Sequence, residues 1–155
     1  MATLQSEETT IPSSIRLSLG ELVRDGGRWI SYSLLLESGG KTLLLEDEGE
    51  EIGRCLLALS PLDEVERLLR GLGRFLEGGK EFSFEPSEPN FELLFRREEL
   101  GFSAYCFIDS GNQHWDHATW DGLGLRMFTT KEHLQRFHAQ LDEEHRHALA
   151  GRTER

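Results

Sequence analysis

The residues best suited to chemistry form the tetrapeptide His114-Trp115-Asp116-His117, because two imidazoles and a carboxylate are ligands for zinc and similar metals. The spacing argues against a metal site. On an extended strand, residues i and i+3 point to opposite faces, so both histidines reach one ion only where the chain bends. We therefore predict an exposed polar loop or edge strand and no bound metal or cofactor. A metal- or small-ligand-binding module built on His114, Asp116 and His117 is the alternative function.

The sequence lacks the motifs that would place a nucleophile or a phosphate-binding loop. It has no Gly-x-Ser-x-Gly elbow, no GxxxxGK[ST] loop, no GxGxxG turn that opens a helix, and no HExxH pair among the histidines of its last helix. Cys106 lies in an apolar run, which predicts an inert, buried thiol. Because no nucleophile, base and orienting group can be named together, we expect that the protein is not an enzyme.

The densest charge feature is an acidic run at residues 46–51, with five carboxylates in six residues. Such a run usually forms a solvated hairpin loop, and this one lacks the ligand pattern of a calcium-binding EF-hand. It can steer a basic protein partner by charge complementarity, and two tryptophans of the separate turn-rich segment 114–120 can add aromatic anchors. The predicted partner-binding residues are therefore Glu46, Asp47, Glu48, Glu50, Glu51, Trp115 and Trp120.

The chain of 155 residues carries 28 Asp plus Glu against 17 Lys plus Arg, a formal net charge of -11. Proteins that bind nucleic acid neutralise phosphates with clusters of Lys and Arg, so we expect no nucleic-acid binding. No stretch approaches 18 consecutive apolar residues, and the first ten residues lack the signal-peptide pattern. Only Cys55 and Cys106 occur, so a disulfide framework is not expected. We expect a cytoplasmic protein without membrane association.

Segments of alternating polarity predict strands in both halves of the chain. In the segment 29–36, for example, Ile30, Tyr32, Leu34 and Leu36 share one face. Residues 96–101 are expected to form a charged hairpin loop, and the apolar run 102–108 to lie in the middle of a sheet. The predicted strands are 15–19, 29–36, 41–45 and 55–59 in the first half, and 81–85, 91–95, 102–108, 114–120 and 123–128 in the second.

Each half is expected to end in an amphipathic helix. Ser60, Pro61 and Asp63 give a start signal for the first helix, and Gly78-Gly79 ends it. Thr129 and Thr130 open the last helix, with Glu132 completing a capping pair. At an offset of 69 residues, the pattern of the first helix repeats in the second: Ser60, Asp63, Val65, Leu68 and Leu72 fall on Thr129, Glu132, Leu134, Phe137 and Leu141.

The element order predicts an α+β fold, with antiparallel sheet(s) of about eight short strands and two helices, arranged as two successive strands-then-helix units. We expect the helices to pack on one face of the sheet system. Residues 1–14, rich in Thr, Ser and Glu, are expected to form a flexible N-terminal arm, and residues 15–150 a single domain. Nothing in the sequence indicates the oligomeric state.

The order of features over residues 16–149 resembles the WapI-type immunity family of bacterial polymorphic toxin systems and its uncharacterised relatives. The matching phrases include Glu88-Pro89-Asn90 before a strand and the passage 125–134 into the last helix. The resemblance implies a small cytoplasmic protein without enzymatic activity that binds and neutralises a toxin domain, often a nuclease. Nuclease toxins are commonly basic, so this implication agrees with an acidic protein that binds a basic partner.

Overall fold

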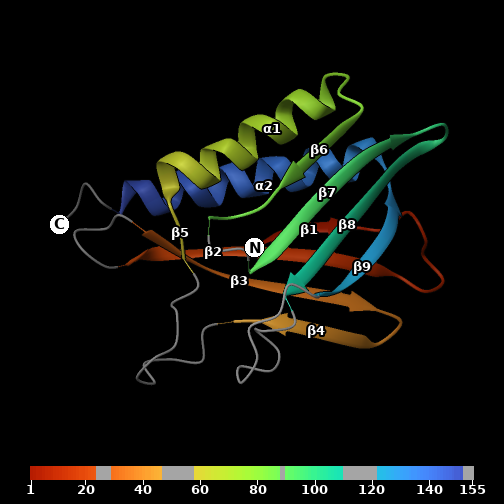
Figure 1. Cartoon of the computed structure of the whole chain (residues 1–155), viewed down its shortest axis with the longest axis horizontal. Helices are drawn as coiled ribbons and strands as arrows, with labels where there is room; N and C mark the ends of the chain where they lie inside the picture. Colours follow the sequence, from red (N-terminus) through yellow and green to blue (C-terminus); the bar gives the residue numbers. More distant parts are fainter. Residues whose placement is uncertain (24–28, 47–57, 88–89, 110–121, 152–155) are drawn as a thin grey trace.

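The computed structural model describes residues 1–23, 29–46, 58–87, 90–109 and 122–151. Its elements follow the predicted order of strands, helix, strands and helix (Figure 1). They are β1 (Ala2–Gln5), β2 (Ser13–Val23), β3 (Trp29–Ser38), β4 (Lys41–Leu45), β5 (Ala58–Leu59), a π-helical turn (Pro61–Val65), α1 (Glu66–Leu76), β6 (Glu81–Phe84), β7 (Phe91–Glu98), β8 (Gly101–Asp109), β9 (Gly122–Thr129) and α2 (Lys131–Ala150).

The strands form two antiparallel sheets. In the first sheet, sheet A, the order is β1-β2-β3-β4, and β5 pairs with β3; in the second, sheet B, the order is β6-β7-β8-β9. The predicted α+β fold and its two strands-then-helix units are confirmed. The described part of the chain contains no helix that is both long and apolar enough to cross a membrane.

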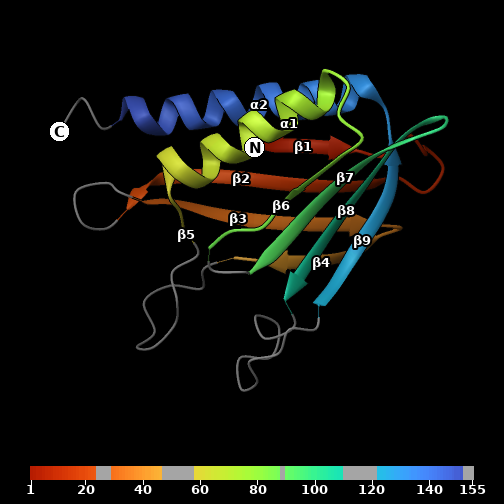
Figure 2. The same ribbon diagram turned by 45° about the horizontal axis from the view of Figure 1, so that its top comes forward.

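Both helices lie on the same side of the two sheets, as expected (Figures 1 and 2). α2 packs against β1 and β2 of sheet A, whereas α1 packs against α2 and against β6 of sheet B. The two sheets also contact each other directly, because the Tyr32 ring of β3 meets the Phe91 ring of β7 edge to face, with centroids 5.3 Å apart. One apolar core therefore joins both sheets and both helices.

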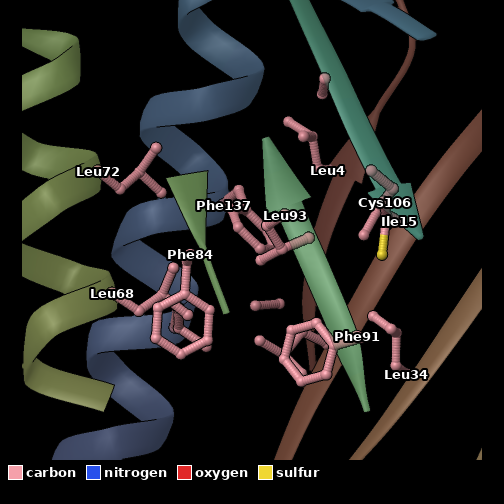
Figure 3. Packing of buried hydrophobic residues seen from close by; sticks show 14 of the residues in the cluster. Leu4, Ile15, Leu34, Leu68, Leu72, Phe84, Phe91, Leu93, Cys106 and Phe137 are labelled. Carbon is pink, nitrogen blue, oxygen red and sulfur yellow. The ribbon is translucent and has the colours of Figure 1, made fainter. Parts of the chain in front are cut away.

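The core follows from the two periodicities of the sequence. Ile30, Tyr32, Leu34 and Leu36 of β3 are buried and alternate with more exposed residues, as the period of two predicts. The helical stripes of the 69-residue repeat are also buried, at Val65, Leu68 and Leu72 in the first unit and at Leu134, Phe137 and Leu141 in the second. Figure 3 shows how side chains from the helices and from both sheets converge in this cluster.

The helix starts differ in detail from the predicted capping pairs. The Ser60 side chain makes no capping hydrogen bond. Instead, the Ser60 backbone N–H donates to Glu64 Oε2 at 2.7 Å, so Glu64 takes the place expected for Asp63. At α2, Thr130 and not Thr129 is the N-cap, and its Oγ1 accepts from the His133 N–H at 3.2 Å. Thr129 ends β9, which fixes the helix start one residue later.

The expectation of a flexible arm over residues 1–14 is wrong for residues 2–5. They form β1, which pairs with β2, and both Ala2 and Leu4 are fully buried. The Thr3 N–H donates to Gln140 Oε1 of α2 at 2.9 Å. β1 thus lies in sheet A next to α2, and its pairing depends on residues far away in the sequence. A four-residue alternation inside a polar segment gives little local signal of such a strand.

The expected loop over residues 96–101 is also wrong, because β7 continues to Glu98 and β8 begins at Gly101. Only two residues connect these strands, and Gly101 has a φ of 112°, which disfavours other residues. Arg97 remains on the strand since its guanidinium donates to Phe75 O and Gly79 O, both at 3.1 Å. Three of the charged residues, Arg96, Arg97 and Glu98, therefore lie on a strand, and Glu99 and Leu100 alone form the connection between the two strands.

Candidate interaction surface

The structure places few of the residues that the sequence singled out. Glu46 follows β4 and is exposed to solvent. The other predicted contact residues, Asp47, Glu48, Glu50, Glu51, Trp115 and Trp120, lie outside the described residues, as do the candidate metal ligands His114, Asp116 and His117 and the predicted strand 114–120. The described residues therefore bring none of the predicted groups together.

The histidines of α2 connect this helix to its neighbours. His138 Nε2 lies 2.9 Å from Leu69 O of α1, and His133 Nδ1 lies 3.1 Å from Gln5 O of β1. His145 is buried along the same stripe as Leu141. In the described ranges, no group of three His, Cys, Asp or Glu side chains is arranged to hold a metal ion. These imidazoles therefore have a structural role at the border of the buried stripe.

Cys106 lies in the middle of sheet B, and its side chain is fully buried. Burial, and secondarily the charge of Glu92, raise the pKa of the Cys106 thiol far above its ordinary value. A thiol with so high a pKa carries no nucleophilic thiolate near neutral pH. The predicted burial of the thiol is confirmed, and its low reactivity stays a prediction.

This burial leads to a direct prediction about thiol reactivity. In a Cys55→Ser variant, the native protein should not react with Ellman's reagent at mildly alkaline pH, because Cys106 is its remaining thiol. The same variant in guanidinium chloride should react promptly and stoichiometrically. Rapid reaction of the native variant would show that β8 opens easily or that Cys106 is accessible.

The outer face of sheet B carries an unusual surface. In β7 and β8, alternate residues such as Leu93 and Cys106 point into the core, and the residues between them point outward. Outward-pointing Phe107 is 39% exposed, and Phe128 on β9 is 56% exposed. We call this surface the aromatic face and define it by the residues Leu94, Arg96, Tyr105, Phe107, Arg126 and Phe128.

The aromatic face is held in a fixed arrangement. The rings of Tyr105 and Phe107 stack with centroids 6.2 Å apart and planes inclined by 27°. The Arg96 guanidinium lies 5.6 Å from the Tyr105 ring, and its Nε donates to Glu81 Oε2 at 2.7 Å. That hydrogen bond with Glu81 raises the pKa of Arg96. The side chains that a partner would meet are therefore ordered in advance, which lowers the entropic cost of binding.

Gly124 of β9 makes this arrangement possible. A Cβ atom at this position would lie 2.5 Å from Phe107 Cδ1 and would collide with the Cys106 carbonyl oxygen. The absent side chain lets the Phe107 ring approach the neighbouring strand. A glycine inside a strand commonly marks such a close approach. The residue pair Phe107 and Gly124 thus shapes the middle of the aromatic face.

Antiparallel sheets that face water on one side usually have polar residues there, so exposed aromatic rings need an explanation. Tyrosine and arginine are enriched at the energetically important positions of protein interfaces. Sequence reasoning placed the run 102–108 correctly in the middle of a sheet, but it missed that Tyr105 and Phe107 point outward. The available signal was that the run is apolar on both of its faces, although only one face meets the core.

Comparison with known proteins adds no family assignment. No protein-family model matches the chain, and no curated protein matches it significantly. The function must therefore be argued from the described surfaces and from the sequence resemblance.

Proposed function

We propose that the protein acts by binding a partner protein and not by catalysis, and that the aromatic face is its main contact surface. The observation that carries the proposal is the stacked pair Tyr105 and Phe107 beside exposed Phe128, on a sheet face turned away from both helices. Aromatic rings provide large contact areas that lose little conformational entropy when they are covered.

The chemistry of the face suits a protein better than a nucleic acid. Aromatic rings beside arginines also occur where proteins bind single strands, but such sites combine them with a positively charged groove. Here Glu81 pairs with Arg96, Glu92 lies on the same face, and the chain as a whole has a net charge of -11. A mixed-charge surface with an aromatic centre is typical of a protein interface.

The resemblance to the immunity family supports a toxin domain as the partner. In this form of the proposal, the protein covers the toxin's functional cleft and so neutralises it. A basic toxin would also be attracted by the acidic run at 46–51, where Glu46 is exposed. No observation on the described residues favours the metal- or ligand-binding alternative, whose residues lie outside them.

The test is an affinity pull-down of the tagged protein from its host cells at low salt, followed by mass spectrometry. Low salt preserves charge-steered complexes that higher ionic strength would screen. A Phe107→Ser/Phe128→Ser double variant on β8 and β9 should lose the partner, because it removes two exposed aromatic anchors without changing the net charge. Leu100→Ser is the matched control, because Leu100 is 92% exposed but lies at the hairpin tip, away from the face.

Retention of one stoichiometric partner by the wild type and by Leu100→Ser, but not by the double variant, supports the proposal. Equal retention by all three proteins would remove the aromatic face from the interface. A further variant with amides at Glu46, Asp47, Glu48, Glu50 and Glu51 tests the acidic run: a basic partner should then bind more weakly and depend less on salt. Unchanged affinity would exclude the run from the interface.

A further inference from the structure

A second surface lies between α1 and β6, on elements other than those of the aromatic face. The chain reverses after α1, so β6 runs back alongside the helix (Figures 1 and 2). Between them is a groove with a volume of about 990 Å³. Phe75, Phe82 and Gly71 contribute its apolar part, and a Cβ atom at Gly71 would collide with the Phe82 ring. The groove therefore depends on a glycine in the middle of the helix.

A stripe of three arginines forms the helical wall of the groove. Arg67, Arg70 and Arg74 are spaced i, i+3 and i+7 and so lie on one side of α1. Arg67 is already engaged, because its guanidinium donates to Glu85 O at 2.8 Å and lies 4.9 Å from the Phe84 ring. Among the described residues, no carboxylate forms an ion pair with Arg70 or Arg74.

Four acidic residues also line the groove, Asp63, Glu64, Glu81 and Glu85, and two of them are engaged elsewhere. Buried Glu64 accepts hydrogen bonds from the backbone N–H groups of Ser60 at 2.7 Å and Ser87 at 2.6 Å. Glu81 accepts from Arg96 Nε at 2.7 Å. These carboxylates satisfy local partners and do not neutralise Arg70 and Arg74. The end of the groove near these two arginines therefore favours a negatively charged ligand, although the chain as a whole is acidic.

The opposite wall of the groove is a strand edge. Among the described strands, β6 is an outer strand of sheet B and pairs with β7 alone. The Arg97 N–H donates to Lys80 O, and Phe82 lies opposite Phe95, so the backbone groups of Phe82 point toward β7. By alternation, the backbone groups of Glu81 and Ser83 point to the other edge. Glu85 O shares this direction and is reached by Arg67 of α1, which shows that the edge faces the helix.

We propose that this groove binds an extended acidic peptide, which adds as a strand to the edge of β6 and places its carboxylates on Arg70 and Arg74. Unpaired strand edges commonly recruit such peptides through backbone hydrogen bonds. The four-residue step from Arg70 to Arg74 spans about 6 Å along the helix. Alternate residues of a strand are separated by about 6.6 Å, so acidic residues at every second position fit both arginines.

Binding can be measured by fluorescence anisotropy on the full chain at low salt. The probe is a labelled peptide of about ten residues that alternates glutamate and threonine, which is long enough to span the edge of β6. The same peptide with lysine in place of glutamate is the ligand control and should not bind. The aromatic face is not involved, so failure of this test leaves the proposed protein interface intact, and the reverse also holds.

The arginine contacts are tested by charge reversal. Arg70→Glu/Arg74→Glu should weaken binding of the glutamate peptide by about tenfold or more, because two attractions become repulsions. Arg136→Glu/Arg146→Glu is the matched control, since it changes the net charge equally at exposed positions of α2. Equal affinity of the two double variants would overturn the proposal, as would the absence of binding to the wild type.

The strand pairing is tested at Ser83. Ser83→Pro removes the N–H that points to the free edge and leaves the hydrogen bonds between β6 and β7 in place. It should weaken peptide binding about as much as the arginine double variant, whereas Ser83→Thr should bind like the wild type. Unaltered binding by a correctly folded Ser83→Pro would overturn the strand-addition geometry. A thymidine oligonucleotide that competes equally well would overturn the assignment to a peptide.

Discussion

Replacement of Leu4 by alanine should lower the free energy of unfolding by about 2–5 kcal/mol. The Leu4 side chain is fully buried on β1, between α2 and β2, so its removal leaves a cavity in the core. Polar contacts also hold β1 in its position in the sheet. For example, the Thr129 hydroxyl donates a hydrogen bond to Gln5 O at 2.7 Å. Urea unfolding followed by circular dichroism measures the change.

Ile11→Ala is the control for this experiment, because Ile11 belongs to the same N-terminal region but is 60% exposed. Its replacement should change stability by less than about 0.5 kcal/mol. The comparison separates the structural strand β1 from an unstructured arm. If Leu4→Ala were as stable as Ile11→Ala, residues 2–5 would not contribute to the core and the original expectation of an arm would be correct.

Local patterns were sufficient to predict most of the fold. The period of two in 29–36 identified the buried face of β3, and the helical spacing identified the buried stripes that contain Leu72 and Leu141. These signals are local, because burial of one face produces them within a single element. The 69-residue repeat predicted the order of two strands-then-helix units, since each unit buries the apolar stripe of its helix in the same way.

The features that sequence reasoning missed depend on pairing between distant residues. β1 forms only because it pairs with β2 and packs against α2. Its hydrogen bond from Thr3 to Gln140 joins residues that are separated by most of the chain. Arg96 and Arg97 remain on a strand because their side chains donate hydrogen bonds to Glu81, Phe75 and Gly79. The distant partners of β1 and of the two arginines cannot be predicted from the neighbouring residues in the sequence. The polar composition of these two segments therefore led to the prediction of an arm and a loop.

The two candidate surfaces also become visible only after the strands are placed in register. Tyr105 and Phe107 were part of an apolar run, and the register of sheet B decides that they share the outward face with Arg126. The arginine stripe of α1 is present in the sequence, but its meaning depends on the edge of β6 beside it. The acidic run, apart from Glu46, and the residues Trp115 and Trp120 lie outside the described residues, so their role stays a prediction.

Phe137→Ala should have the largest effect on stability, with a loss of about 3–5 kcal/mol. Phe137 is fully buried on α2 and belongs to the core cluster that also contains side chains from α1 and sheet B (Figure 3). Its loss would therefore weaken the contact of α2 with the rest of the core. Heat and urea unfolding of the purified variant measure the change.

Phe128→Ala is the matched control, because it removes an equal ring that is 56% exposed on the aromatic face. Its stability should remain within about 0.5 kcal/mol of the wild type, whereas its partner binding should fall. Phe137→Ala at a temperature where it is folded should keep binding. A Phe128 variant that unfolds as readily as the Phe137 variant would mean that Phe128 supports the fold. Its exposed ring would then no longer be evidence that the aromatic face binds a partner.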